Sequence, residues 1–322
     1  MKPMRRIWLI LAVMLAAPAQ AEIDPLLRPI GGDAATRRWL QPQEPLRIFG
    51  NTYSIGFGGV SVILIDTGNG LVLIDGALPQ AVPAIEDNIR HLGFDIRQVK
   101  LILSSEPHYD HAGGLAALSR DSGALVLASR VGVRVLQAGR ADLDHDDPEG
   151  GLLDSPPAVQ RLRVVRDRQI VRLGKVALSA LETNGHTGGS MSWSWISCEN
   201  GSCLHMVFAA SLTPTRLADY RFSDPAHMGI VANYRRSFKK IRHLRCNIML
   251  SAHPSQSGGD EKFAGLSAGK TPNPYIDPDA CRVYADNFSK LLDQRISAEA
   301  ANPVAEDKWS HDDMEVCATS HY

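Results

Sequence analysis

The sequence predicts an α/β protein in which two β-sheets pack face to face and helices cover their outer surfaces. Short apolar segments of strand length recur along the chain, and amphipathic helical periods separate them. The order of strands, helix and strand occurs twice, which is typical of two packed sheets with helices outside. The two halves share no obvious repeat, so this symmetry rests on element order alone.

The first half of the pattern lies in residues 52–137. An Asn-Gly pair at 69–70 indicates a hairpin. Apolar residues three and four apart after Pro79 predict a helix that ends at Gly93. Segment 99–103 is continuously apolar, consistent with a strand buried on both faces. Strands are expected at 52–57, 60–66, 71–75, 99–103 and 124–129, and further helices at 114–119 and 131–137.

The second half and the flanks complete the expected single domain of residues 22–322. Residues 22–50 are proline-rich without a clear period, which predicts an extended arm lying over the domain. From about residue 299 the chain is polar and acidic, as in a loosely held tail. Strands are expected at 162–166, 176–183, 191–197, 203–211 and 246–252, with helices within 226–243 and around 278–296.

The first 21 residues have the pattern of a secretory signal peptide. Lys2, Arg5 and Arg6 precede the apolar run IWLILAVMLAA, and AQA at 19–21 supplies a cleavage site. The run is too short and wrongly flanked for a membrane span. The mature protein is therefore expected to be periplasmic and to have no membrane anchor.

Charge and cysteine content narrow the partners and the compartment. Removing the signal peptide changes the formal charge from −1 to −4, and the absence of a basic block argues against nucleic acid. A monomer that acts on a small molecule is expected. All five cysteines lie in the mature part, where pairing is favoured, and their odd number leaves at least one thiol free or paired between chains. Cys198 and Cys203 flank a turn that could join them, and Cys317 is left over.

The segment LILSSEPHYDHAGGL, residues 101–115, places potential metal ligands directly after a predicted buried strand. Two further histidines follow strands in the same way, His186 in ETNGHTGGS and His253 in MLSAHPSQSGG. If these strand ends share one rim of the sandwich, six ligands converge as two groups of three, each with an open position for water. The ligands in the first segment are Glu106, His108, Asp110 and His111.

The motifs EPHYDHAGG, NGHTGGS and SAHP resemble those of the metallo-β-lactamase superfamily, whose usual first motif is HxHxDH. The chain is most similar to class B, subclass 3 metallo-β-lactamases, through WLQPQEPLRI, LVLIDGALPQ, ANYRRSF and the region around Cys246 and Cys281. The similarity extends over residues 38–290. It implies an αββα sandwich, which agrees with the element order, and a zinc hydrolase that opens the β-lactam ring of penicillins, cephalosporins or carbapenems.

The resemblance also implies two zinc ions with an attacking zinc-bound hydroxide between them. Asp110 would both ligate one ion and orient the hydroxide. The first zinc site would comprise Glu106, His108 and His186, and the second would comprise Asp110, His111 and His253.

Further roles follow from the same resemblance. Ser211 and Thr213 would hold the substrate carboxylate, and Cys246–Cys281 would form a structural disulfide.

Asp75, at the end of a predicted strand, is either an acceptor for a ligand histidine or only the residue that initiates a turn. The acidic run in residues 139–160 is expected to be solvated, although a loop of this length often forms a functional rim.

Glu106 stands where the usual motif has its first histidine. A carboxylate oxygen is an acceptable zinc donor, and its negative charge would make water on the first ion less acidic. The alternative is a decayed site that holds only one ion. Because the other five ligands are intact, we interpret Glu106 as a ligand that supports hydrolysis but weakens metal retention at the first site.

Two other functions fit the same motifs. One is a superfamily hydrolase of another small ester, lactone or thioester, and the other is a weakly active metal-binding protein with a degraded site. The signal peptide and the Cys246/Cys281 pair favour the β-lactamase over the other superfamily hydrolase.

Overall fold

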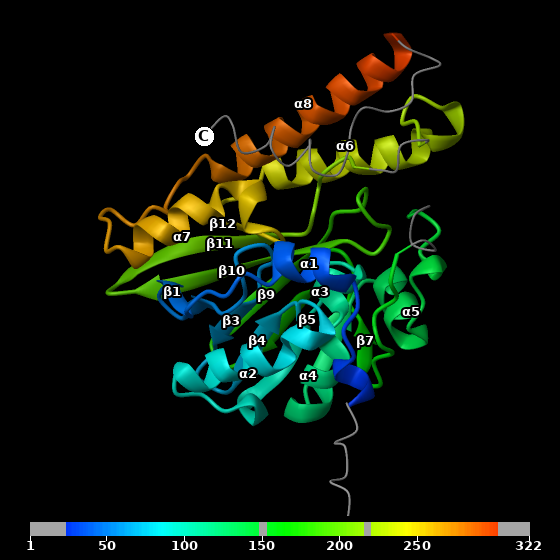
Figure 1. The fold of residues 1–322 in the computed structure, drawn as a ribbon. Helices are drawn as coiled ribbons and strands as arrows, with labels where there is room; N and C mark the ends of the chain where they lie inside the picture. The colour runs from blue at the N-terminus through cyan, green and yellow to red at the C-terminus, as the bar shows by residue number, and fades with distance from the viewer. Residues whose placement is uncertain (1–23, 148–152, 216–219, 302–322) are drawn as a thin grey trace, which may run out of the picture.

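The computed structural model describes residues 24–147, 153–215 and 220–301. Within these residues two β-sheets pack face to face with helices on both outer surfaces, so the predicted sandwich is confirmed (Figure 1). The expected signal peptide lies outside the described residues. The loosely held tail was expected from about residue 299. Residues 299–301 are helical, and the rest of the expected tail lies outside the described residues.

The first sheet has seven strands in the order β1-β2-β3-β4-β5-β6-β7. The predicted hairpin is confirmed, because β3 and β4 pair antiparallel up to Asp66 and Leu71. From β4 to β7 the strands run parallel, so their carboxyl ends meet at one edge. The strands are β1 Leu46–Phe49, β2 Thr52–Ser54, β3 Ile63–Asp66, β4 Leu71–Ile74, β5 Val99–Leu103, β6 Leu125–Ala128 and β7 Leu162–Val164.

The second sheet has five strands in the order β12-β11-β10-β9-β8. The edge strand β8 was not predicted, because its exposed Ile170 and Arg172 alternate with a single buried residue in a charged segment. The turn between β10 and β11 carries the Cys198–Cys203 disulfide. The strands are β8 Ile170–Leu173, β9 Val176–Glu182, β10 Met191–Glu199, β11 Ser202–Ala209 and β12 Ile248–Ser251.

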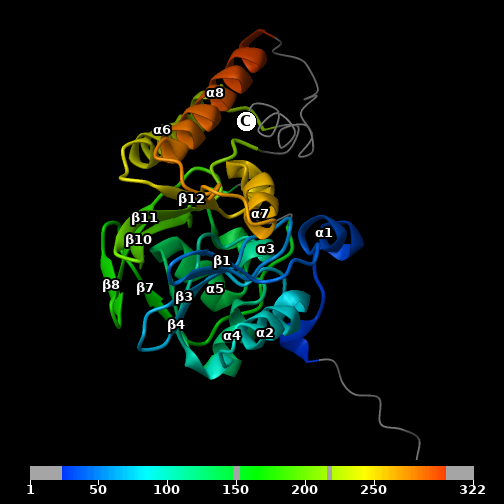
Figure 2. The same ribbon diagram turned by 90° about the vertical axis from the view of Figure 1, so that its left-hand side faces the viewer.

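Three apolar clusters separate four layers. One lies between the sheets, one lies under α2 and α4, and one lies under α6 and α8. The view turned by 90° shows α6 and α8 across one outer face and α2 and α4 across the other (Figure 2). The Cys246–Cys281 disulfide that the resemblance implied is present and joins α8 to the segment before β12. No described helix is long and apolar enough to span a membrane.

The helices add two corrections to the sequence prediction. The arm at 22–50 is not simply extended, since it contains α1 and β1. The loop after β12 contains α7, a short helix of weak amphipathic character that periodicity does not reveal. The α-helices are α1 Gly32–Trp39, α2 Val82–His91, α3 Tyr109–Ala112, α4 Leu115–Ser122, α5 Arg130–Ala138, α6 Met228–Arg242, α7 Gly259–Ser267 and α8 Ala280–Ala301. The 3-10 helices are η1 Pro25–Leu27, η2 Pro79–Ala81, η3 Ile96–Gln98, η4 Ala141–Leu143, η5 Pro225–His227 and η6 Pro254–Ser257.

Candidate metal centre

The predicted ligands converge where strands of both sheets end. Glu106 and His108 follow β5, His186 follows β9, and His253 follows β12. Two hydrogen bonds align the sheets at this rim. The N–H of Met191 donates to the carbonyl of Ser105 at 2.6 Å, and the Trp193 indole donates to the carbonyl of Ser104 at 3.2 Å.

The motif between β5 and α4 folds into one tight helical turn. Helix α3 turns Asp110 and His111 inward, and both are buried. The following glycines let this turn approach the end of β4, since a Cβ on Gly114 would lie 2.2 Å from the carbonyl oxygen of Gly76. A side chain at Gly114 would therefore push α3, with its two predicted ligands, away from the first sheet.

Glu106, His108 and His186 form a first triad, whose ligating atoms lie within 4.8 Å of one another. Glu106 is 1% exposed. Its Oε2 accepts the Ser211 N–H at 3.0 Å, and its Oε1 lies 3.8 Å from His108 Nδ1 and 3.9 Å from His186 Nε2. Among the described residues, Oε1 accepts no hydrogen bond of normal geometry, although it lies 3.1 Å from His111 Nε2. One carboxylate oxygen is thus fixed by the backbone, and the other points into the cluster.

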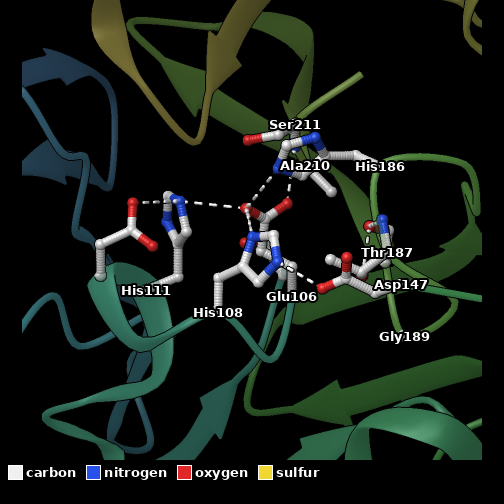
Figure 3. Close-up of polar contacts among 12 residues, drawn as sticks. Glu106, His108, His111, Asp147, His186, Thr187, Gly189, Ala210 and Ser211 are labelled. Atoms are coloured by element: carbon white, nitrogen blue, oxygen red, sulfur yellow. Dashed lines mark hydrogen bonds and ion pairs between the residues drawn. The ribbon is translucent and has the colours of Figure 1, made fainter. Parts of the chain in front are cut away.

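Asp110, His111 and His253 form a second triad of the same composition, also within 4.8 Å. His111 Nε2 lies 3.2 Å from both Asp110 Oδ2 and His253 Nε2. It also lies 3.1 Å from Glu106 Oε1. Figure 3 shows the rings of His111, His108 and His186 around the Glu106 carboxylate. The two triads are therefore adjacent and meet at Glu106 and His111.

Each of the four histidines has one ring nitrogen in the cluster and the other facing a protein oxygen. Such outer partners fix the tautomer and the orientation of a metal-binding imidazole. The outer pairs are His108 Nε2 with Asp147 Oδ2 at 2.8 Å, His186 Nδ1 with the Thr213 carbonyl at 3.1 Å, His253 Nδ1 with the Gly59 carbonyl at 2.7 Å and His111 Nδ1 with Asp75 Oδ2 at 3.5 Å.

Asp75 combines the two roles that the sequence left open. Its backbone has a φ of 64°, so it does form the turn after β4. Its fully buried carboxylate accepts the N–H and O–H of Ser105 at 2.7 and 2.5 Å and faces His111. The turn thus delivers the carboxylate to the second triad.

The charges of the cluster favour a bound cation. Burial lowers the pKa of His108, but Asp147, Glu106 and Asp110 together outweigh it and raise that pKa to about 9. Burial also lowers the pKa of His111, yet Asp110 and Glu106 hold it well above its usual value. Burial raises the pKa of Glu106, but His111 and His186 hold it below its usual range. Without a metal the carboxylates recruit protons onto the imidazoles, and a divalent cation would replace those protons. The six residues therefore fit a metal centre.

The structure corrects the expectation that the acidic run after α5 is solvated. Asp144 and Asp147 are 2% and 5% exposed, whereas Asp142, His145 and Asp146 are exposed as expected. Aspartates in a loop rich in glycine and proline carry no periodic signal that separates buried from exposed positions. Asp147 was therefore missed as a partner of His108.

The two predicted substrate-binding residues lie beside the first triad. The Ser211 hydroxyl is buried and has no hydrogen-bond partner among the described residues. The Thr213 hydroxyl lies 3.4 Å from His186 Nδ1, so it faces a predicted ligand. Trp39 from the arm lies near the second triad, with its ring centroid 6.1 Å from that of His253. Sequence reasoning did not single out Trp39.

Comparison with known proteins agrees with this geometry. Residues 55–253 match the model of the metallo-beta-lactamase superfamily. A solved B3 metallo-β-lactamase, described as the first with an active-site glutamic acid, is 46% identical, with 87% of this chain and 99% of that chain covered and a TM-score of 0.78. The Rm3 metallo-β-lactamase is 40% identical, with 84% and 99% covered and a TM-score of 0.79.

Two more distant relatives come from named organisms. BJP-1, a subclass B3 metallo-β-lactamase of Bradyrhizobium japonicum, is 32% identical, with 84% of this chain and 99% of that chain covered and a TM-score of 0.74. The uncharacterized protein YobT of Bacillus subtilis (strain 168) is 31% identical over 152 residues, which are 45% of this chain and 60% of that protein. The matched region of the family model contains all six clustered residues, and this chain belongs to the metallo-β-lactamase superfamily.

Proposed function

We propose that this protein is a zinc-dependent hydrolase that opens the β-lactam ring of antibiotics. The observation that carries the proposal is the pair of adjoining triads, which share a 3.1 Å contact between Glu106 Oε1 and His111 Nε2. Their setting supports the substrate class, because the chain is 46% identical to a B3 metallo-β-lactamase with an active-site glutamic acid. The six predicted ligands are proposed in the two groups given above.

The donor set suits zinc, since borderline-soft zinc is bound by imidazole and carboxylate. When bound, zinc would lower the pKa of a coordinated water towards neutrality and polarise the lactam carbonyl. The backbone N–H of Ser211 holds Glu106 Oε2, which leaves Oε1 as the one carboxylate oxygen in a fixed position to bind the metal. Asp110 Oδ2 lies 3.4 Å from His253 Nε2, where it can orient a water between the triads.

Substrate contacts are proposed for residues around this cluster. The Ser211 hydroxyl, without a partner among the described residues, is the donor proposed for the substrate carboxylate. Thr213 is proposed as a second contact for the substrate carboxylate, although its hydroxyl faces His186. Trp39 offers an apolar surface beside His253. The choice among penicillins, cephalosporins and carbapenems would then depend on the arm and on the loop after α5.

Export to the periplasm is part of the same proposal. Disulfides form and persist in oxidising compartments, and both Cys198–Cys203 and Cys246–Cys281 are bonded.

A chromogenic cephalosporin tests the function directly. The purified protein is expected to hydrolyse it, to lose activity after treatment with a chelator, and to regain activity with added zinc. Absence of chelator-sensitive turnover would contradict the proposal. Chelator-sensitive hydrolysis of a lactone or thioester, without turnover of any β-lactam, would instead support the other superfamily activity.

A further inference from the structure

The acidic turn, defined here as residues 144–147, directs two of its four side chains into the protein. Asp144 and Asp147 are buried, whereas His145 and Asp146 are exposed. The turn is closed by a hydrogen bond from the Asp147 N–H to the Asp144 carbonyl at 3.0 Å. This geometry places both buried carboxylates on the side of the first triad.

Asp147 determines which nitrogen of His108 faces the cluster. Its Oδ2 accepts from His108 Nε2 at 2.8 Å, and the opposite nitrogen, Nδ1, is the one near Glu106 Oε1. Figure 3 shows His108 between Asp147 and Glu106. A carboxylate on the outer nitrogen keeps the proton there and leaves the inner nitrogen free to bind a metal.

Asp144 holds the loop that carries His186. Its Oδ2 accepts the Gly189 N–H at 3.0 Å, and its Oδ1 packs so closely on Gly188 that a Cβ there would lie 2.4 Å away. The Gly189 carbonyl is held in turn by the Ser129 hydroxyl at 2.9 Å. The same four-residue turn therefore contacts both histidine-bearing segments of the first triad, which are distant from each other in sequence.

We propose that the acidic turn is a positioning element for the first metal site, in which Asp147 orients His108 and Asp144 anchors the loop of His186. This inference rests on the proposed metal binding but not on the identity of the substrate. The buried polar contacts of the second triad come from Asp75 and Gly59 instead. Loss of Asp147 should therefore weaken one of the two sites selectively.

Zinc retention in Asp147→Ala tests the proposal, with Asp142→Ala as the matched control, because Asp142 is exposed just before the turn and pairs with Arg140. The zinc-loaded proteins are dialysed against graded chelator, and the bound zinc is counted. In Asp147→Ala the affinity of one ion should fall about 10- to 100-fold, the range for loss of an outer partner. The second ion should be retained as in the parent. Asp142→Ala should match the parent for both ions.

Two further measurements separate positioning from general damage. Histidine side-chain ¹⁵N resonances should assign the weakened ion to His108 and His186 and leave His111 and His253 unchanged. Asp147→Asn, whose amide oxygen can still accept from Nε2, should retain zinc better than Asp147→Ala. It also provides the test if the alanine variant does not fold.

Three results would overturn the inference. These are parental retention of both ions in Asp147→Ala, equal loss from both triads, or equal weakening by Asp142→Ala. Because the readout is zinc and not turnover, failure of the β-lactam assay leaves this test intact. Conversely, parental zinc binding in Asp147→Ala alongside cephalosporin hydrolysis would refute the positioning role alone.

Discussion

The two triads have the same composition, one carboxylate and two imidazoles, but their outer partners lie on different parts of the fold. The second triad is held by Asp75 at the end of β4 and by the Gly59 carbonyl between β2 and β3. The first is held by Asp147 after η4 and by the Thr213 carbonyl after β11. The supports of the second triad thus adjoin strands of the first sheet, whereas those of the first triad lie in loops from two separate regions. Two sites with the same kinds of ligand can therefore differ in metal affinity, because different parts of the fold hold the ligands.

The carboxylates of the two triads also differ. Asp110 belongs to the usual motif, whereas Glu106 replaces an imidazole. Its Oε2 is held by the Ser211 N–H, and its Oε1 faces His111 of the other triad at 3.1 Å. Imidazole suits zinc well, while carboxylates also suit harder cations. Because Glu106 Oε1 also lies beside His111 of the second triad, and because the outer partners of the first triad lie in loops, we expect the first triad to hold zinc less firmly than the second.

The largest effect is expected from His111→Ala, because His111 belongs to the second triad and contacts Glu106 of the first. The variant should lose the second zinc ion, and with it several kcal/mol of transition-state stabilisation, or about a thousandfold in cephalosporin hydrolysis. His91→Ala, at an exposed position on α2, is the control. Turnover within tenfold of the parent in His111→Ala would contradict the role of the second triad.

Asp75→Asn should have a smaller effect that is confined to the second site. The amide keeps an oxygen for the Ser105 N–H but removes the negative charge facing His111. We expect about a tenfold loss of zinc affinity at the second triad, at the low end for an outer partner. Zinc titration measures it, with Asp66→Asn at the end of β3 as the control. If Asp75→Asn weakened zinc binding at the first triad instead, the assignment of Asp75 as a support of the second triad would be wrong.

The smallest effect is expected from Tyr234→Phe. The Tyr234 hydroxyl donates to the Thr213 carbonyl at 2.9 Å, and that carbonyl also accepts from His186. Loss of this bond should lower the free energy of unfolding by about 1 kcal/mol and weaken zinc retention at the first triad only.

Tyr275→Phe is the control for Tyr234→Phe, because its hydroxyl bonds the Gly259 carbonyl outside both triads. Denaturant unfolding should give similar losses for both variants, while only Tyr234→Phe changes zinc retention. Equal zinc retention in the two variants would contradict the role of the Thr213 carbonyl as a support of His186.

Sequence patterns predicted the parts of the site that depend on local order. The apolar strand before Glu106 and the strand-end positions of His186 and His253 are local features, and the structure brings these residues together. The resemblance to subclass 3 metallo-β-lactamases is confirmed by solved structures that cover most of the chain.

Of the four outer partners of the triads, Asp75 had such a signal because it lies at the end of a predicted strand, whereas the other three had none. The carbonyls of Thr213 and Gly59 act through the backbone, so their side chains do not reveal the contacts. Asp147 and His108 lie 39 residues apart, and only tertiary packing brings them together. Helix α1 was missed for a related reason, because its polar sequence has only Ala35 buried. The outer partners of the histidines and helix α1 depend on tertiary contacts, which residue type alone does not reveal.

Stepwise zinc removal from the parent and from Glu106→His tests the inequality of the two triads most directly. The parent should release one zinc ion at a lower chelator concentration than the other. Glu106→His should hold the first ion more firmly, so that the gap between the two ions narrows. Equal zinc occupancy of the parent and Glu106→His after dialysis against a mild chelator would contradict the account.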